Sequence, residues 1–241
     1  MISVLTPSHR IEHLWRTQKC LNRQTFKEGF EWIVCSSKKP GLDCRWIPDP
    51  KKVNGDFYSL NKAFNALFRE AQGELCIMVC DMTWFASDLL EKLWEIHKSS
   101  PKVCVRGIGN QYEEFGPSGT PEKLCWVDPM PNGNLVEQIH PNLMEFRVAA
   151  VPKQMWTDVG GVDEGYDKVA ALSEKEFCIR GGMLDYRFFL DRRIEYRFVR
   201  HEDHGQPWND AYEKGCVLFN EHMEGLKKGT RKPRLGAIWV N

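Results

Sequence analysis

Short apolar runs alternate with amphipathic segments through the first 106 residues of the chain. The apolar runs, which we predict to be strands, cover residues 2–5, 32–35, 45–47, 75–80 and 102–106. The segments between them repeat apolar residues at helical spacing and cover residues 10–22, 59–73 and 89–98. Strands that alternate with helices are typical of a mostly parallel sheet. The pattern therefore predicts an α/β fold, a single Rossmann-like domain whose central sheet is flanked by helices.

The run at residues 75–80 differs from the others because it has no polar alternation. Such a run is typical of a strand buried on both faces, as in the middle of a parallel sheet. It ends at Asp81, and Ser87 or Asp88 can cap the helix that follows. A carboxylate at the C-terminal end of a central strand lies where open α/β sheets bind ligands. The alternative is that Asp81 only ends the strand or caps a turn.

The second half of the chain is less regular. Residues 107–141 contain two glycine- and proline-rich clusters and predict a long loop, functional or mobile. We then expect strands at 146–151, 188–190 and 196–199, a glycine-rich turn at 159–167, and helices at 173–184 and 209–228. Ser173 and Glu176 have the spacing of a capping box for the first of these helices.

Composition excludes several classes of protein. The chain has 241 residues, enough for one sizeable core, and its net charge is zero, so global charge favours neither nucleic acid nor membranes. Its nine cysteines include no Cys-x-x-Cys pair, which argues against a zinc ribbon or a thioredoxin and favours a reduced, cytoplasmic protein. No apolar stretch approaches the roughly 20 residues of a transmembrane helix, and no signal peptide is predicted at the N-terminus.

Several short motifs occur in an order that resembles one family. They are ISVLTPSHR at 2–10, QT at 24–25, EWIV at 31–34, NKA at 61–63, GE at 73–74, CD at 80–81, GGVDE at 160–164 and EKEFCIR at 174–180. Together they resemble the family 2 glycosyltransferases of the GT-A fold, over residues 2 to about 204. The resemblance implies transfer of a hexose, with inversion, from a nucleotide-diphosphate sugar such as a UDP-sugar, assisted by Mn²⁺ or Mg²⁺.

The same resemblance divides the chain into functional parts. Residues 1–226 correspond to the GT-A domain, with a nucleotide-binding half at about 1–106 and an acceptor half at about 107–226. Residues 227–241 form a basic C-terminal tail, which we expect to be loosely attached.

The resemblance assigns the metal to Asp81-Met82-Thr83, where the family has Asp-x-Asp. A divalent cation stabilises the charge that develops on the diphosphate leaving group, and such hard cations prefer oxygen ligands. Because the second carboxylate is replaced by Thr83, a weak neutral ligand, the ion would arrive mainly with the nucleotide. His201 or His204 could supply a further ligand, and His201 is favoured because it directly follows a predicted strand. Alternatively, both are surface histidines in a polar turn.

The resemblance also assigns the catalytic base. The base in the family is an Asp at the start of a helix near the acceptor, and Glu174 occupies the matching position. Glu176 is the second choice. In the alternative reading, either carboxylate only stabilises the helix N-terminus by its charge.

Donor recognition is assigned to two strand ends and one helix. The matching residues are Pro7, Ser8, His9, Arg10, Ser36, Ser37, Asn61 and Lys62, with Asp81 on the phosphate side. The family usually has an Asp where Ser36 and Ser37 stand, to bind the edge of uracil. Lys62 would otherwise be a solvated helix lysine.

Other functions stay open on the sequence alone. Thr83, Ser36, Ser37 and Ser173 replace family acids, so a catalytically impaired module that only binds nucleotide or sugar is the main alternative. A nucleotidyltransferase is disfavoured because no glycine-rich phosphate loop follows the first strand. The acceptor is not identified, although Trp126 is a candidate for stacking on it. The basic tail could contact a membrane surface or a nucleic acid, and a modified nucleic-acid base is a lower-ranked acceptor.

Overall fold

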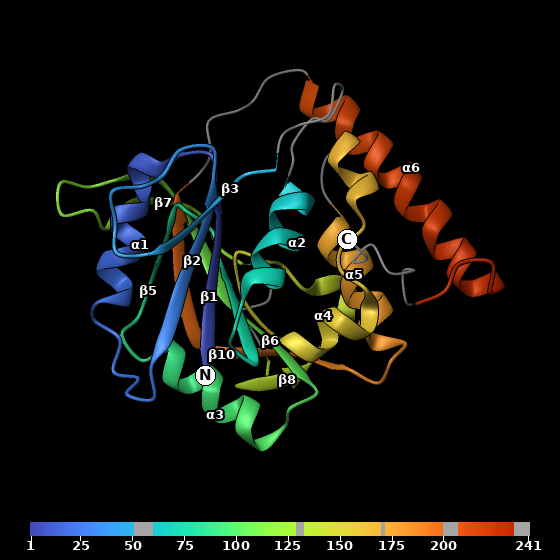
Figure 1. Cartoon of the computed structure of the whole chain (residues 1–241), viewed down its shortest axis with the longest axis horizontal. Helices are drawn as coiled ribbons and strands as arrows, with labels where there is room; N and C mark the ends of the chain where they lie inside the picture. Colours follow the sequence, from blue (N-terminus) through green and yellow to red (C-terminus); the bar gives the residue numbers. More distant parts are fainter. Residues whose placement is uncertain (51–59, 129–132, 170–171, 200–206, 234–241) are drawn as a thin grey trace.

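The computed structural model describes residues 1–50, 60–128, 133–169, 172–199 and 207–233. Its ten strands form one sheet (Figure 1), and eight of them follow the order β3-β2-β1-β4-β9-β6-β10-β5, with β7 paired to β6 and β8 paired to β10. The strands are β1 Ile2–Ser8, β2 Phe30–Ser36, β3 Arg45–Pro48, β4 Leu75–Val79, β5 Thr83–Phe85, β6 Val103–Phe115, β7 Pro121–Trp126, β8 Val136–Gln138, β9 Val148–Pro152 and β10 Arg187–Val199. The helices are α1 Leu14–Leu21, α2 Leu60–Glu70, α3 Leu89–Ser99, α4 Lys153–Val159, α5 Ser173–Gly182 and α6 Pro207–Lys228, with short 3-10 turns η1 Ile11–His13, η2 Pro141–Leu143 and η3 Glu164–Lys168.

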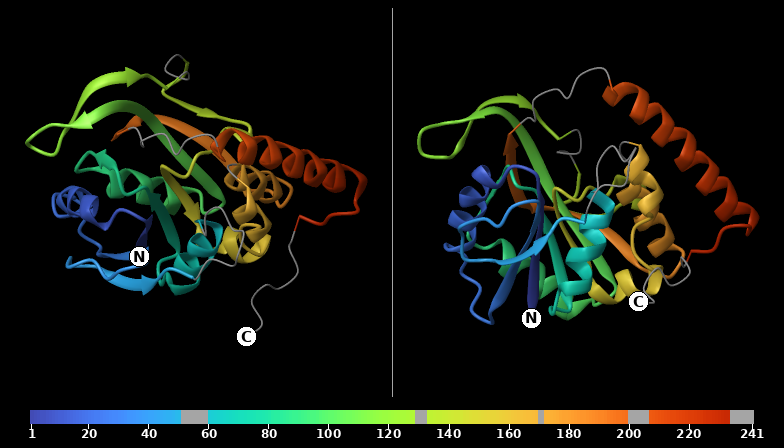
Figure 2. Two further views of the ribbon diagram at one scale, coloured as in Figure 1. Left: turned by 90° about the horizontal axis from the view of Figure 1, so that it is seen from above. Right: turned by 45° about the horizontal axis from the view of Figure 1, so that its top comes forward.

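The sheet is mostly parallel. The strands β3, β2, β1, β4, β6 and β10 run in one direction, whereas β9 and β5 run in the opposite one. Helices cover both faces (Figure 2): α2, α4 and α5 pack over one apolar cluster, and α1 and α3 pack over the other. The α/β fold predicted from the sequence is therefore confirmed.

The strand predicted at the centre of the sheet is β4, which lies between β1 and β9. All five of its residues are buried, because apolar side chains alternate between the two clusters. Asp81 follows this strand and is 7% exposed.

The prediction of a loop at residues 107–141 was wrong, because much of this segment is a β-hairpin. Strand β6 continues to Phe115, the chain turns at Gly116–Thr120, and β7 returns along β6. Gly119 has a φ of +79° and a Cβ there would meet the Trp15 ring at 2.5 Å, so the turn packs against α1 only because this residue is glycine. Five of the six β7 residues are exposed, which removes the apolar pattern from which a strand is predicted.

Other expectations were wrong in detail. The strands predicted at 188–190 and 196–199 are one strand, β10, with an irregularity between Leu190 and Glu195. The residue before α5 is Leu172, which makes no capping bond through its side chain, so Ser173 and Glu176 do not form a capping box. Asp88 stands at the N-cap of α3 without a capping bond and pairs with Lys92 at 2.8 Å instead.

Among the described helices, none combines the length and the hydrophobicity needed to cross a lipid bilayer.

Candidate functional site

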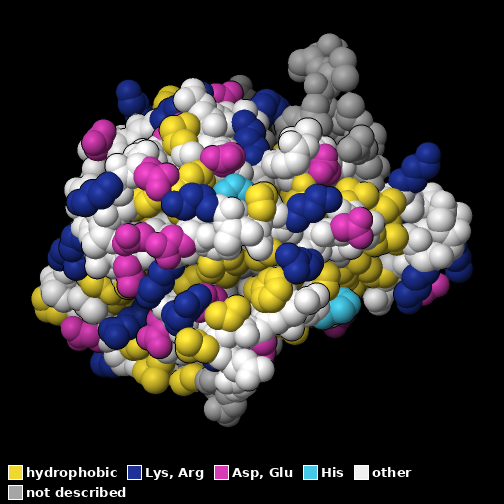
Figure 3. Space-filling view, turned by 90° about the horizontal axis from the view of Figure 1, so that it is seen from below, with side chains coloured by type: hydrophobic (Ala, Val, Ile, Leu, Met, Phe, Trp, Pro, Cys, Tyr) yellow, Lys and Arg dark blue, Asp and Glu magenta, His cyan; other side chains and the backbone are white. Residues whose placement is uncertain are grey.

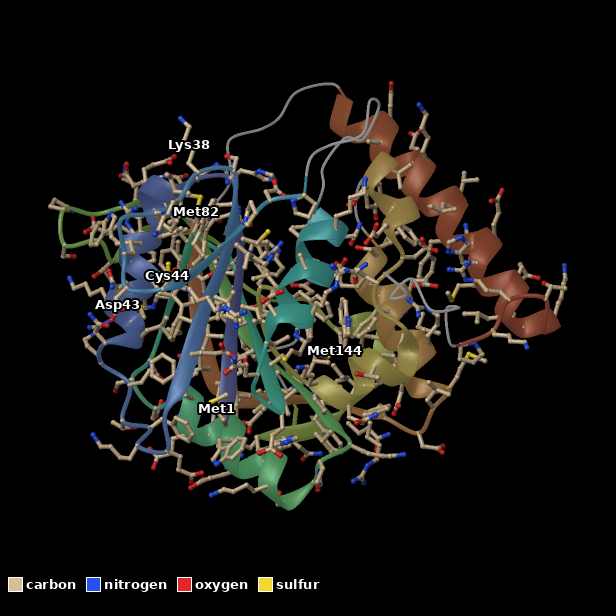
Figure 4. All side chains as sticks on the ribbon, viewed as in Figure 1. Met1, Lys38, Asp43, Cys44, Met82 and Met144 are labelled. Carbon is tan, nitrogen blue, oxygen red and sulfur yellow. The ribbon has the colours of Figure 1, made fainter. Side chains whose placement is uncertain are left out.

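Strands β1, β2 and β4 end side by side at one edge of the sheet. Ser8 is in register with Ser36, and its hydroxyl donates a hydrogen bond of 2.9 Å to Oδ2 of Asp81. The same hydroxyl accepts a bond of 3.0 Å from the backbone N–H of Arg10. Figure 4 shows Met82 and Lys38 near this edge and Met1 at the opposite edge. The sequence therefore folds so that the turn after β1 holds the carboxylate after β4.

Asp81 is buried among groups that can carry positive charge. Burial raises the pKa of its carboxyl, whereas the Ser8 hydrogen bond and the charges of Arg10, His13 and His9 lower the pKa. Arg10 contacts the sulfur of Met82 at 3.5 Å. A buried carboxylate whose pKa is shifted by burial and by neighbouring charges is a candidate for a functional group.

Thr83 lies at the start of β5, opposite Phe198 of β10. Its side chain is fully buried, and its hydroxyl has no hydrogen-bond partner within the described parts of the chain. The Asp81 carboxylate is the kind of oxygen ligand that Mg²⁺ and Mn²⁺ prefer, whereas the Thr83 hydroxyl is enclosed by protein. His201 and His204 lie outside the described residues.

The Thr83 hydroxyl gives a direct test of its role. We expect Thr83→Val to raise the free energy of unfolding by about 1 kcal/mol, because it removes an unpaired buried hydroxyl at nearly constant shape. Turnover should stay close to that of the unchanged protein if Thr83 is only a weak ligand. Chemical denaturation and donor turnover measured on the same preparation check both points. A large loss of turnover without loss of stability would make Thr83 an essential ligand.

The residues assigned to the nucleotide base lie at the ends of β1 and β2. Pro7 is partly exposed, and His9 is exposed with its Nδ1 at 3.9 Å from Oδ2 of Asp49. Ser36 is buried and its hydroxyl donates to the carbonyl of Lys38 at 2.7 Å, whereas Ser37 is exposed. The structure thus brings these residues together, and it leaves Ser37 rather than Ser36 with a hydroxyl open to solvent.

Asn61 and Lys62 lie in the first turn of α2 and are held there by Asp167, a residue that we did not predict. The carboxylate of Asp167 accepts hydrogen bonds from the backbone N–H groups of Asn61 at 2.8 Å and Lys62 at 3.1 Å, and from the Asn61 side chain at 3.0 Å. Burial raises the pKa of Asp167 to about 6, against the lowering effect of these bonds. Asp167 therefore caps α2 from a position 106 residues away in sequence.

We expect Asp167→Ala to lower the free energy of unfolding by about 2 kcal/mol, because it leaves the N–H groups of the first turn of α2 without an acceptor. Asp167→Asn keeps one carbonyl acceptor and should lose less. Urea denaturation of the two variants checks the order, and equal stability of Asp167→Ala and the unchanged protein would contradict the capping role.

Glu174 is the second residue of α5 and is partly exposed. Burial by the surrounding protein raises the pKa of its carboxyl, and Ser173 donates a hydrogen bond of 3.4 Å to it. The pKa of the Cys80 thiol is raised to about 12, mainly by burial and further by the charges of Asp81 and Glu174. Asp81 and Glu174 thus both act on the Cys80 thiol through their charge.

Glu176 has a different environment from Glu174. It is fully buried and forms an ion pair of 2.8 Å with Arg180, which also donates to the carbonyls of Val159 and Gly161. Arg231 bonds to Glu176 at 3.1 Å and to Asp163 at 2.5 Å. The network fixes the glycine-rich turn, and Arg231 shows that the first residues of the basic tail are docked rather than loose.

The same network contains a possible metal-binding group. Ligand atoms of Asp163, Glu176 and His222 lie within 4.8 Å of one another. However, the guanidinium groups of Arg180 and Arg231 already neutralise the two carboxylates. We therefore interpret this group as a structural ion network.

Comparison with known proteins gives matches in structure only. No protein-family model and no curated protein matches the sequence. The structure of GalNAc-T7 with UDP, GalNAc and Mn²⁺ is similar, with a TM-score of 0.69, 11% identity and 92% of this chain covered. Residues 1–349 of S. aureus TarS give a TM-score of 0.61 at 14% identity over 82% of this chain, and the same segment with UDP gives 0.56 at 12% identity over 83%.

The chain spans 48% of the GalNAc-T7 chain and 60% of the TarS segment. Likeness at such low identity shows the fold, and that fold agrees with the one that the ordered motifs resemble. The chain therefore has a GT-A-like fold.

Proposed function

We propose that this protein is a glycosyltransferase that moves a hexose from a UDP-sugar to an acceptor hydroxyl with inversion. The observation that carries the proposal is Asp81, a buried carboxylate held by Ser8 at the ends of β1 and β4. The charges of Arg10, His13 and His9 lower the pKa of Asp81, and the charge of Glu174 raises the pKa of the neighbouring Cys80. The UDP and Mn²⁺ in structures of the same fold support the choice of donor and metal.

Each residue then has a role. Asp81 and Thr83 would hold Mn²⁺ or Mg²⁺, with His201 as a third ligand, and the ion would offset the charge of the diphosphate. Pro7, Ser8, His9, Arg10 and Ser37 would contact the nucleotide. Asn61 and Lys62 would lie on the sugar-phosphate side at the start of α2.

Glu174 would be the base. The acceptor oxygen attacks the anomeric carbon from the face opposite the diphosphate, the bond to the diphosphate oxygen breaks, and the acceptor proton moves to the Glu174 carboxylate. A raised pKa suits this role, since it brings the base closer to the working pH. Residues 1–106 would thus bind the donor and residues 107–226 would contribute the acceptor side.

A binding module without turnover is the second candidate. It is favoured by the single carboxylate in Asp81-Met82-Thr83 and by the burial of Thr83. A nucleic-acid acceptor ranks lower: on the face shown in Figure 3, Lys and Arg side chains are interspersed with Asp and Glu, and Arg231 of the basic tail is committed to the ion network.

Titration with UDP separates these candidates. We expect UDP to bind about tenfold or more tightly when Mn²⁺ is present, because Asp81 would hold the ion and the ion would offset the charge of the diphosphate. UDP-glucose or another UDP-hexose should be hydrolysed slowly to UDP, and a chelator should stop the hydrolysis. UDP binding without consumption of any UDP-hexose would favour the binding module. Absence of UDP binding would contradict both candidates.

A further inference from the structure

Arg147 lies beside the candidate site and belongs to none of the sequence motifs. Its carbonyl accepts a hydrogen bond of 3.0 Å from the N–H of Cys80, the residue before Asp81. This hydrogen bond continues the antiparallel pairing of β4 with β9, in which Val79 is opposite Val148. Arg147 therefore stands across from the end of the strand that carries Asp81.

The side chain of Arg147 rests on an aromatic pair. Its guanidinium carbon is 4.1 Å from the centre of the Phe198 ring, and the Trp126 ring meets Phe198 edge-on at 6.3 Å. Phe198 is opposite Thr83 in the sheet, and Trp126 is 38% exposed. The stack thus extends from Thr83, in the metal motif, toward an aromatic ring that is open to solvent.

The guanidinium has no carboxylate within ion-pair distance among the residues that the structure describes. Arg147 is partly exposed, and stacking on a ring uses the flat face of the guanidinium while leaving the N–H groups at its edge available. Those groups match a carboxylate or a phosphate with two parallel hydrogen bonds.

We propose that Arg147 binds a carboxylate or phosphate group of a sugar held beside Asp81, so that the enzyme acts on a charged sugar. The proposal rests on the proposed function, because it places a sugar in that space. The charge could belong to the donor sugar, as in a uronate, or to the acceptor, as in a sugar phosphate.

Two titrations distinguish these sources. In the donor arm, UDP-glucuronate is compared with UDP-glucose. In the acceptor arm, glucose 6-phosphate is compared with glucose in the presence of saturating UDP and Mn²⁺. We expect the charged member to bind about 10- to 100-fold more tightly in one of the two arms, the usual scale for hydrogen bonds between charged groups.

The variants assign that preference to one side chain. Arg147→Gln should remove it, Arg147→Lys should keep part of it, and Arg187→Gln should leave it unchanged. Arg187 is the matched control, because it stacks on Phe189 at 5.9 Å at the start of β10. UDP should bind equally to all four proteins. The proposal would be overturned if the charged compound bound no more tightly in either arm, or if its tighter binding survived in Arg147→Gln. The proposed function would still stand in that case, provided that UDP binds. Absence of UDP binding to the unchanged protein would overturn both.

Discussion

Asp81→Asn is expected to abolish sugar transfer, by about 10³-fold or more, without unfolding the protein. The amide keeps the size of the side chain and can still accept the Ser8 hydrogen bond. It cannot supply the negative charge that binds a divalent ion, and that ion is worth several kcal/mol of stabilisation to a diphosphate leaving group. Single-turnover transfer and Mn²⁺-dependent UDP binding measured on the variant check the prediction. Transfer within tenfold of the unchanged protein would remove Asp81 from the mechanism.

The same variant should be more stable than the unchanged protein at pH 7. Burial raises the folded-state pKa of Asp81 above that of the unfolded chain, so the ionised carboxylate costs stability at pH values above the folded-state pKa. As pH falls through the folded-state pKa toward 3.8, the folded protein takes up the proton first, and the cost disappears. The difference in Tm between Asp81→Asn and the unchanged protein should therefore shrink as pH falls. A difference that grows toward acid pH would show that the carboxylate stabilises the fold.

Glu174→Gln is expected to lower transfer by about 10²-fold or more, the scale for loss of a general base. UDP affinity should not change, because the role proposed for Glu174 concerns the acceptor and not the donor. The raised pKa also places the acidic limb of the pH–rate profile above the ordinary Glu value of 4.5. Single-turnover rates across this pH range, beside a UDP titration, check both statements.

Two other glutamates serve as controls for Glu174→Gln. Glu95→Gln removes an exposed carboxylate on α3 and should leave both rate and stability unchanged. Glu176→Gln should instead lower the free energy of unfolding by about 3 kcal/mol, because it breaks a buried ion pair. Near-normal transfer by Glu174→Gln would mean that the base lies elsewhere; Asp203 would be the next candidate, since Asp163 is paired with Arg231.

The sequence predicted well those elements whose pattern is local. The apolar run before Asp81 specifies a strand buried on both faces, and neighbouring parallel strands then bring Ser8 to Asp81. The β6–β7 hairpin was missed because the exposed strand β7 lacks an apolar pattern and its turn has loop composition.

Long-range partners could not be predicted in the same way. Asp167 caps a helix that begins more than 100 residues earlier. Arg147, just before β9, packs on Phe198 of β10, beyond the intervening strand β6. Glu174 and Glu176 look alike in sequence, whereas the structure separates them by burial: one is partly exposed and the other is enclosed by two arginines.

A crystal structure of the protein soaked with UDP and Mn²⁺ tests the central claim most directly. We expect the diphosphate and the ion beside Asp81, with the uridine against the ends of β1 and β2 near Ser8 and Ser37. UDP bound elsewhere on the molecule, or a site beside Asp81 that stays empty at saturating UDP, would contradict the assignment of this edge of the sheet to a nucleotide-sugar donor.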